Sequence, residues 1–301
     1  MSDVASTLPV VPVTPLRRFA RAFAASRMAL FGLALLLVIV GVAILAPWIS
    51  PQDPYDLTQL DILDGRLPPG SVAATGMTHW LGTDDQGRDM LSAILYGLRI
   101  SLFVGLASAV VAAAIGAMLG LFAAYAGGRI EATIMRLVDL QLSFPAILIA
   151  LMILAFLGKG IANVVLALVI VEWATYARTA RASALTESRK EYIEAATAMG
   201  ASGARILFRH LLPNCTTPLL VIATVQVARA IALEATLSFL GLGVPVTEPS
   251  LGMLIANGYQ YMLSGKFWIS FYPGLALLLT VVAINMVGDH LRDVLNPRRE
   301  A

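Results

Sequence analysis

Long apolar runs without a charged side chain dominate the pattern of residues along this chain. A helix needs about 20 apolar residues to cross a bilayer core of about 30 Å. Runs that meet or approach this length cover residues 28–49, 100–128, 140–158, 161–171 (extended to about 176), 211–228 (continuing to about 240) and 267–288. The pattern therefore predicts an all-α, polytopic membrane protein with six transmembrane helices.

The composition supports a membrane location. Hydrophobic residues make up 58% of the chain and charged residues 13%, whereas charged residues make up about 25% of a typical soluble domain. Such a chain has too few polar groups to cover its apolar surface. The formal net charge is +2, and the basic residues are not gathered into the patch typical of nucleic-acid-binding proteins. We therefore expect contact with membrane lipid and none with nucleic acid.

The loops between the predicted helices differ in their content of Lys and Arg. Fifteen basic residues fall on the side that holds the amino terminus and five on the other side, with Arg229 inside a span. The fifteen are Arg17, Arg18, Arg21, Arg27, Arg129, Arg136, Arg178, Arg181, Arg189, Lys190, Arg205, Arg209, Arg292, Arg298 and Arg299. The five are Arg66, Arg88, Arg99, Lys159 and Lys266. Because cytoplasmic loops carry the basic excess, both termini are predicted to be cytoplasmic.

Two tails flank the predicted spans. Residues 1–27 are predicted to form a cytoplasmic amino-terminal tail, and residues 1–16, rich in Pro, Val, Ser and Thr without periodicity, are expected to be disordered. Residues 28–49 form the first transmembrane helix. The polar segment before this helix is longer than in a secretory signal peptide, and no A-x-A cleavage site follows the helix, so we expect an uncleaved membrane anchor. Residues 290–301 form the cytoplasmic carboxyl-terminal tail.

Two features of the spans are expected to serve packing. Gly116 and Gly120 form a G-x-x-x-G pattern that allows close approach of a second helix. Cys215 is the only cysteine, which excludes an internal disulfide. We expect it to be a small packed residue.

The longest external segment is predicted at residues 50–98. Its first half is rich in Pro, Gly and Asp, as turns are. The second half carries apolar residues at a helical spacing, namely Met90, Leu91, Ile94, Leu95 and Leu98. This spacing predicts an amphipathic helix that lies at the membrane surface.

Four titratable residues stand close together in this segment: His79, Asp84, Asp85 and Asp89. Their mixture of imidazole and carboxylate groups could suggest a metal site. The spacing matches no common metal motif, however, and Thr83 or Asp84 is well placed to cap the helix that follows. We therefore expect helix capping and contact with a partner protein, and no bound metal.

The most polar helical stretch, EYIEAATAMGASGARILFRHLLPN at 191–214, lies between two membrane-length runs. Ser188 followed by Glu191 predicts a capping box at the start of a helix, and Gly200 is a suitable residue to end it. Arg205 and Arg209 are predicted one turn apart on a second helix that enters the membrane near Pro213. Alanines 195, 196 and 198 leave a low profile, so another protein could approach the first helix closely.

This loop resembles the EAA loop of bacterial ABC-importer permeases. The resemblance rests on Glu194-Ala195-Ala196, on Gly200 and on Leu212-Pro213. The family usually has an aliphatic residue ten positions after the glycine; this chain has His210, and histidine is found there in the peptide branch.

Three other segments resemble hallmarks of the dipeptide/oligopeptide/nickel branch of this family. They are HWLGTDDQGRDMLSAILYGLRISL (79–102), LSFLGLG (237–243) and GDHLRDVLNPR (288–298). Four such motifs in the right order cover nearly everything from residue 28 to residue 298. By them the chain most resembles the second permease subunit of dipeptide importers.

The resemblance implies the type I ABC importer permease fold, with residues 99–289 as a transmembrane core of five helices and residues 180–212 as its coupling loop. It also implies residues that couple the permease to the ATPase: Glu194, Ala195, Ala196, Gly200, Arg205, Arg209 and Pro213. The implied partners are a homologous second permease in a heterodimer, two cytoplasmic ATPase subunits and an extracytoplasmic substrate-binding protein. The implied location is the bacterial inner membrane.

The chain contains no G-x-x-x-x-G-K-[ST] phosphate loop. ATP and Mg are therefore expected on the partner ATPase subunits, with no cofactor and no catalytic residue in this chain. On the family's pattern, ATP binding closes the ATPase pair, moves the docked helices and switches the permease pair from inward-facing to outward-facing.

Four charged residues lie inside or near the predicted spans, where a charge at the bilayer centre costs about 2.5–3.5 kcal/mol. Asp139 and Glu172 fall near the cytoplasmic face, so solvation at a helix end is the expectation. Arg229 and Glu234 lie five residues apart, roughly 140° around a helix, so they need not pair with each other. Either they line the translocation path or they form salt bridges to neighbouring helices.

Two other classes of transport protein can be weighed. A proton-coupled secondary transporter would use an intramembrane carboxylate such as Glu234 and often has an inverted repeat, which is not evident here. A channel requires a pore-lining filter or a ring of charges, and the sequence shows neither. Within the importer class, the cargo is open among dipeptides, longer peptides, glutathione-like molecules, opines and nickel complexes.

Overall fold

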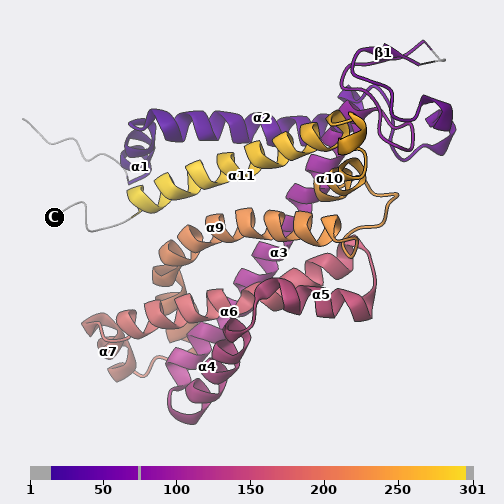
Figure 1. Ribbon diagram of the computed structural model, residues 1–301. Helices are drawn as coiled ribbons and strands as arrows, with labels where there is room; N and C mark the ends of the chain where they lie inside the picture. Colours follow the sequence, from indigo (N-terminus) through magenta and orange to yellow (C-terminus); the bar gives the residue numbers. More distant parts are fainter. Residues whose placement is uncertain (1–14, 74–75, 296–301) are drawn as a thin grey trace, which may run out of the picture.

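The computed structural model describes residues 15–73 and 76–295, and almost all of its regular structure is helical (Figure 1). The long helices are α2 (Arg27–Ile49), α3 (Met90–Ala126), α6 (Ile161–Glu187), α9 (Leu212–Phe239) and α11 (Trp268–Val294). Shorter ones are α1 (Pro15–Ala24), α4 (Gly128–Ser143), α5 (Ala146–Leu157), α7 (Glu191–Ala198), α8 (Gly203–Arg205) and α10 (Leu251–Tyr259). The two-residue strands β1 (Ser71–Val72) and β2 (Thr78–His79) pair antiparallel. The expectations for residues 1–14 and 296–301 lie outside the described residues.

Within the described chain, five helical spans are long and apolar enough to cross a membrane: α2, α3, α6, α11 and the continuous stretch Gly203–Phe239. The predicted span at 140–158 is instead broken, because α4 and α5 meet at an angle of 92°. Phe144 is extended (φ −95°, ψ 144°), the conformation that a following proline imposes, and Pro145 is the N-cap of α5. The structure therefore has six spans only if this bent pair counts as one.

Helix α3 is the central element of the fold. It packs along α6, and the predicted glycine contact is confirmed there. A Cβ atom on Gly116 would lie 2.3 Å from the carbonyl oxygen of Trp173, and one on Gly120 would lie 2.2 Å from that of Ala177. Cys215 is fully buried in the apolar cluster beside these helices, as expected of a packed residue.

Helices α2 and α11 form a second layer beside this core (Figure 1). They approach closely at Gly32, where a Cβ atom would lie 2.7 Å from the Cβ of Met286. Helix α1 turns back onto the end of α11, where Phe23 makes an edge contact with His290. The start of α2, the end of α11 and α7 thus lie at one end of the molecule, and the β1–β2 loops lie at the other (Figure 1).

The predicted surface helix in segment 50–98 differs from the structure. Its residues form the first turns of α3, which runs without a break to Ala126. Met90, Ile94, Leu95 and Leu98 are buried, three of them in a cluster with α2, α10 and α11. The apolar face is helical as predicted, but it is covered by protein rather than exposed to the membrane surface.

Residues 50–73 and 76–89 form a unit, called here the loop lobe, held by buried polar contacts. His79 Nδ1 lies 3.0 Å from Asp89 Oδ1, and Arg88 Nε donates to Asp84 Oδ2 at 2.7 Å. The cap of α3 is Asp89, which accepts from the Ser92 amide at 2.8 Å. The prediction of Thr83 or Asp84 as the cap is wrong, since Asp84 accepts instead from the amides of a preceding turn.

Candidate coupling loop and intramembrane charges

Helix α7 begins where the sequence pattern places a helix, but not with the predicted cap. Lys190 precedes its first residue, Glu191, and no side chain caps the helix. Ser188 belongs to the end of α6, where its hydroxyl donates to the Leu185 carbonyl at 3.1 Å. The capping-box prediction is therefore wrong. The acidic residues of the first turn, Glu191 and Glu194, favour the helix through its dipole instead.

Gly200 ends α7 in the left-handed conformation that the sequence predicts, with φ +78°. The Gly200 amide donates to the Thr197 carbonyl at 2.9 Å, and the Ala201 amide donates to that of Ala196 at 3.0 Å. These two bonds form a Schellman motif, which turns the chain sharply back towards the membrane. A residue with a β-branched side chain would resist this conformation.

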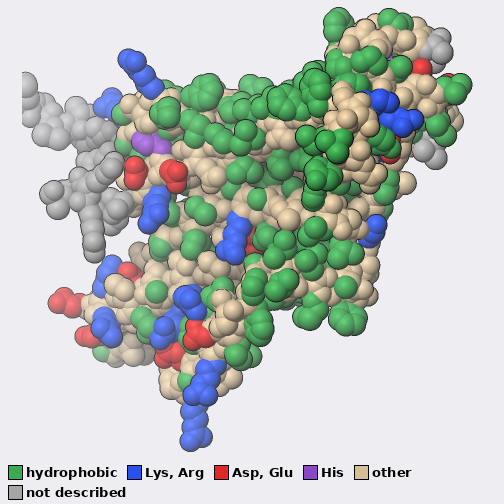
Figure 2. Space-filling view, in the orientation of Figure 1, with side chains coloured by type: hydrophobic (Ala, Val, Ile, Leu, Met, Phe, Trp, Pro, Cys, Tyr) green, Lys and Arg blue, Asp and Glu red, His purple; other side chains and the backbone are tan. Residues whose placement is uncertain are grey.

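The two faces of α7 have different roles. Ile193 and Ala196 are buried, and Ile193 packs in the cluster that holds α3, α6 and α9 together. Glu194, Ala195 and Ala198 are exposed. This exposed face is small apart from its acidic group, and it lies at the end of the molecule where Figure 2 shows charged side chains gathered. A partner can approach it without displacing any packed residue.

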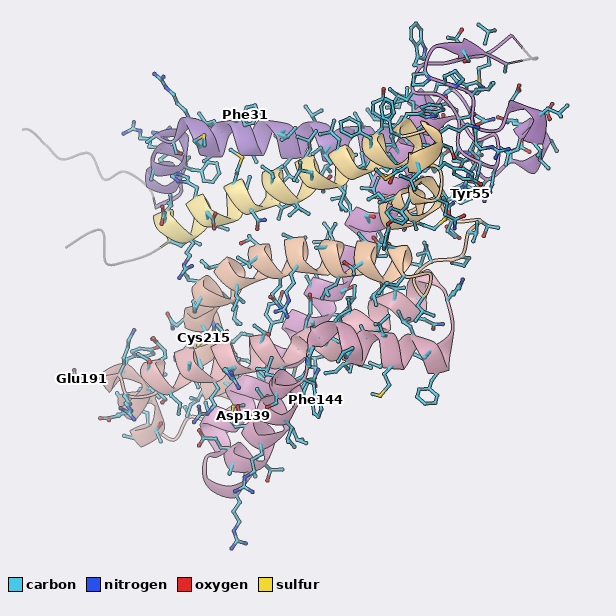
Figure 3. The ribbon with its side chains drawn as sticks, viewed as in Figure 1. Phe31, Tyr55, Asp139, Phe144, Glu191 and Cys215 are labelled. Atoms are coloured by element: carbon cyan, nitrogen blue, oxygen red, sulfur yellow. The ribbon has the colours of Figure 1, made fainter. Side chains whose placement is uncertain are left out.

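A tyrosine fixes the position of α7 relative to the membrane helices. The Tyr192 hydroxyl donates to Glu187 Oε1 of α6 at 2.5 Å and accepts from Asn214 Nδ2 of α9 at 3.1 Å. Lys190 Nζ pairs with Glu187 Oε2 at 2.7 Å. Partial burial, together with the Glu187 carboxylate, raises the pKa of Tyr192 to about 12, so the hydroxyl keeps its proton at neutral pH. In Figure 3, Glu191 marks the far end of this loop and Cys215 the nearby start of α9.

Replacing Tyr192 with phenylalanine should loosen this attachment while keeping the ring. A hydrogen bond to a charged group contributes about 1.5–3 kcal/mol, so α7 should exchange its amide protons faster. Hydrogen–deuterium exchange of the purified protein measures this directly. Thr197→Val is a matched control, because the Thr197 hydroxyl bonds only within α7. Equal exchange in Tyr192→Phe and the unmodified chain would contradict the anchoring role.

The return from α7 to the membrane is not the regular helix predicted from Arg205 and Arg209. Three residues of α8 lead into a π-helical stretch, Ile206–Leu211, in which the Leu212 amide bonds to Leu207. Pro213 lies in the first turn of α9 and has no amide hydrogen to continue an α-helical ladder. Arg205 and Arg209 are both exposed.

The structure separates Arg229 and Glu234. Arg229 is exposed on the face of α9 that also shows Val225, Ala232 and Thr236. Glu234 is fully buried on another face. Its carboxylate accepts from the hydroxyls of Ser101 at 2.9 Å and Ser238 at 2.8 Å, and it also interacts with that of Ser250.

Helices α3, α9 and the start of α10 thus meet at the Glu234 carboxylate. Of the two residues, only Arg229 is placed where a passing solute could touch it.

The expectation for Glu172 is wrong, and that for Asp139 is incomplete. Glu172 lies within α6 and is buried, and neither of its carboxylate oxygens has a hydrogen-bond partner. Arg229 is the charged group that acts on it. Asp139 is exposed, but it pairs with Arg178 of α6 rather than with solvent alone. In Figure 3, Asp139 lies on α4, close to the bend at Phe144.

Sequence reasoning missed the Tyr192–Glu187–Asn214 contacts and the serines around Glu234. Tyr192 and Asn214 are 22 residues apart, so no local spacing links them. One of the serine contacts with Glu234 could have been predicted from the sequence. Ser238 lies four residues after Glu234, one helical turn away, and a carboxylate within an apolar run needs such a donor.

None of the described residues forms a group of three or more His, Cys, Asp or Glu side chains that could hold a metal ion. The His79–Asp89 and Asp84–Arg88 pairs of the loop lobe use their polar atoms on each other and on nearby backbone. These pairs stabilise the start of α3.

Known protein families match both parts of the chain. The family described as "Binding-protein-dependent transport system inner membrane component" matches residues 116–301. The family described as "N-terminal TM domain of oligopeptide transport permease C" matches residues 14–69.

Individual proteins match over nearly the whole length. A di/tripeptide transport system permease, DppC, of Pseudomonas aeruginosa is 41% identical over 98% of this chain and 96% of its own. The dipeptide transport system permease DppC of Escherichia coli is 40% identical over 96% of this chain and 95% of its own.

A solved structure shares the fold. It is the MetNI methionine ABC transporter in inward-facing conformations, with a TM-score of 0.56 and 21% identity over 69% of this chain and 98% of that one. The match shows a permease fold for the part of the chain that it covers. With the family matches and the two relatives, it shows that this chain belongs to the binding-protein-dependent inner-membrane permeases of ABC importers, in the branch of the dipeptide permeases.

Proposed function

We propose that this chain is a translocation subunit of an ATP-driven importer for dipeptides or oligopeptides, in the inner membrane of a bacterium. The observation that carries the proposal is the geometry of α7. A short helix with one buried face and one small exposed face projects from the ends of two membrane-crossing helices. The peptide cargo rests on the relatives whose names specify di- or tripeptide transport. Permeases for nickel, glutathione or opines are the alternatives.

The coupling step follows from this geometry. Two ATPase subunits bind at the cytoplasmic end, one on the exposed face of α7 around Glu194, Ala195 and Ala198 and the other on the second permease. Ala196, also predicted as a coupling residue, lies on the buried face and supports the helix from within. Because Ile193 packs against α3, α6 and α9, a displacement of α7 is transmitted to helices that cross the membrane. The second permease completes the path as a heterodimer, and a binding protein delivers cargo to the opposite face. This chain then performs no covalent chemistry.

The experiment is to co-express the chain with its partner subunits and to isolate the complex through a tag on this chain. The proposal predicts that the ATPase subunits co-purify and that binding protein loaded with dipeptide stimulates ATP hydrolysis. Arg129→Gln is a control, because Arg129 is exposed and belongs to α4 rather than to α7. The proposal would be contradicted if a complex with a substituted α7 surface, such as Glu194→Lys, showed the same stimulated ATP hydrolysis as the unmodified complex.

Topology gives a separate prediction. In the structure, α7, α1 and the end of α11 lie at the same end of the molecule, opposite the β1–β2 loops (Figure 1). With the basic excess at the α7 end, reporter fusions at 185–190 should report the cytoplasm. Fusions at residue 70, after Gly160 and within 245–265 should report the external side. A cytoplasmic signal at residue 70 would invert the orientation and remove α7 from reach of a cytoplasmic ATPase.

A further inference from the structure

An apolar groove opens on the outer surface between α2, α3, α9 and α11, with a volume of about 580 Å³. Its walls are almost wholly aliphatic and aromatic, and the single charged residue among them is Arg99. The groove follows α2 from Leu36 to Trp48, a distance of about 18 Å at 1.5 Å per residue. None of its walls belongs to α7 or to the Arg229 face of α9, so the groove is separate from the proposed coupling and path residues.

Arg99 lies at one end of this groove. It is exposed, and within the described part of the chain it interacts electrostatically with Tyr55 and Tyr96 but forms no hydrogen bond or ion pair. The charge-free run of α3 begins at the next residue, Ile100. A cation at the edge of a hydrophobic span needs either water or an anion.

Trp48 lies at the same end and is 76% exposed. Exposed tryptophans are typical of the boundary between lipid tails and headgroups. Arg99 and Trp48 therefore place one end of the groove at the headgroup level. The rest of the groove, towards Leu36 and Leu106, lies at the depth of the lipid tails.

The groove is complementary to a molecule with an anionic group at one end and a hydrocarbon chain at the other. It offers a guanidinium at the headgroup level and an aliphatic channel about 18 Å long beneath it. A guanidinium binds phosphate through paired, charge-assisted hydrogen bonds. A transmembrane helix of a partner, about 10 Å in diameter, would need more room than a groove of about 580 Å³ provides. It would also need an acidic residue to pair with Arg99.

We infer that this groove is a specific site for a glycerophospholipid, with the phosphate on Arg99 and one acyl chain between α2, α3, α9 and α11. The bound lipid covers the outer surface where α2 and α11 meet α3 and α9, beside the buried clusters in which these helices already pack. It thereby adds apolar contacts to this junction within the membrane. The inference does not depend on the cargo or on the ATPase.

Native mass spectrometry of the full chain in its complex, with dioleoylphosphatidylglycerol as the probe, tests the site. Arg99→Gln should weaken binding on the order of tenfold, which corresponds to about 1.4 kcal/mol, because it removes the charge-assisted hydrogen bonds to the phosphate. Lys159→Gln is the matched control, since Lys159 is an exposed cation outside the groove. It should leave binding unchanged.

Further experiments distinguish the contribution of the lipid headgroup to binding from that of the acyl chain. Dioleoylglycerol, which has no phosphate, should bind weakly and equally to the unmodified chain and Arg99→Gln. Leu106→Trp, which fills the groove from an exposed position, should weaken the binding of both lipids. Inorganic phosphate alone should not protect Arg99 from modification by phenylglyoxal, whereas phosphatidylglycerol should.

Three results would overturn the inference. One is equal phosphatidylglycerol binding by the unmodified chain, Arg99→Gln and Leu106→Trp. A second is binding that Lys159→Gln reduces as much as Arg99→Gln does. The third is a photoreactive residue at position 106 that cross-links to the partner permease rather than to lipid, which would show that a protein helix occupies the groove.

Discussion

A complex that contains Gly200→Val is expected to lose most of its substrate-stimulated ATP hydrolysis while its membrane helices stay folded. Gly200 has φ +78°, and a Cβ atom at this position would meet no atom within 4 Å beyond its two chain neighbours, so strain in the backbone, and not a clash, is the cause. The left-handed conformation costs other residues about 1–2 kcal/mol, and β-branched ones more. The Schellman turn opens as a result, and α7 is redirected.

Gly200→Asn is the informative companion, because asparagine tolerates this conformation better than other residues. It should retain much more coupling than the valine variant. Glu194→Lys approaches the same interface from the other side. Losing one partner of a desolvated charge pair costs about 2–5 kcal/mol, so the ATPase should dissociate during purification. Normal co-purification and stimulation in both Gly200→Val and Glu194→Lys would exclude α7 as the coupling element.

Glu234→Leu is expected to reduce the amount of complex in the membrane strongly. The change leaves the hydroxyls of Ser101, Ser238 and Ser250 facing an apolar side chain. Each buried hydroxyl that loses the acceptor for its proton costs about 1–3 kcal/mol. Glu234→Gln keeps an acceptor oxygen and should lower the amount of complex less. Quantitative immunoblotting of membranes and thermal unfolding of the purified complex give the two measurements.

Arg229→Gln should behave in the opposite way. Arg229 is exposed, so the amount of complex should stay normal while uptake of charged peptides falls. The control is Ala232→Ser, on the same exposed face of α9. Normal uptake by Arg229→Gln would remove this residue from the path. Normal complex levels in Glu234→Leu would remove the structural role of the carboxylate.

The sequence predicts the ends of a membrane helix well where charged residues flank the apolar run and none falls inside it. The predicted span 28–49 differs from α2 by one residue at its start. Hydropathy fails at 140–158 because it measures how apolar a segment is and not its direction. Pro145 is visible in the sequence, but the angle of 92° depends on the packing of α4 and α5 against α6.

In the candidate site, too, features set by adjacent residues could be predicted and features set by residues far apart in the chain could not. Gly200 could be predicted, because the left-handed turn after a helix is a property of a few adjacent residues. The burial of Glu172 could not, since the apolar run stops at Val171 although α6 continues to Glu187. The place of Glu234 depends on Ser101, 133 residues away. Such contacts exist only once α3 and α9 have packed.

The most direct test of an ATP-driven permease is uptake of a labelled dipeptide into proteoliposomes that contain this chain with its partner permease and ATPases. Binding protein is supplied outside, and Mg-ATP is enclosed inside. We expect accumulation that requires ATP, persists when a protonophore collapses the proton gradient and disappears in Glu194→Lys. Accumulation without ATP that a proton gradient drives and Glu194→Lys leaves unchanged would contradict an ATP-driven mechanism, and would identify a secondary transporter.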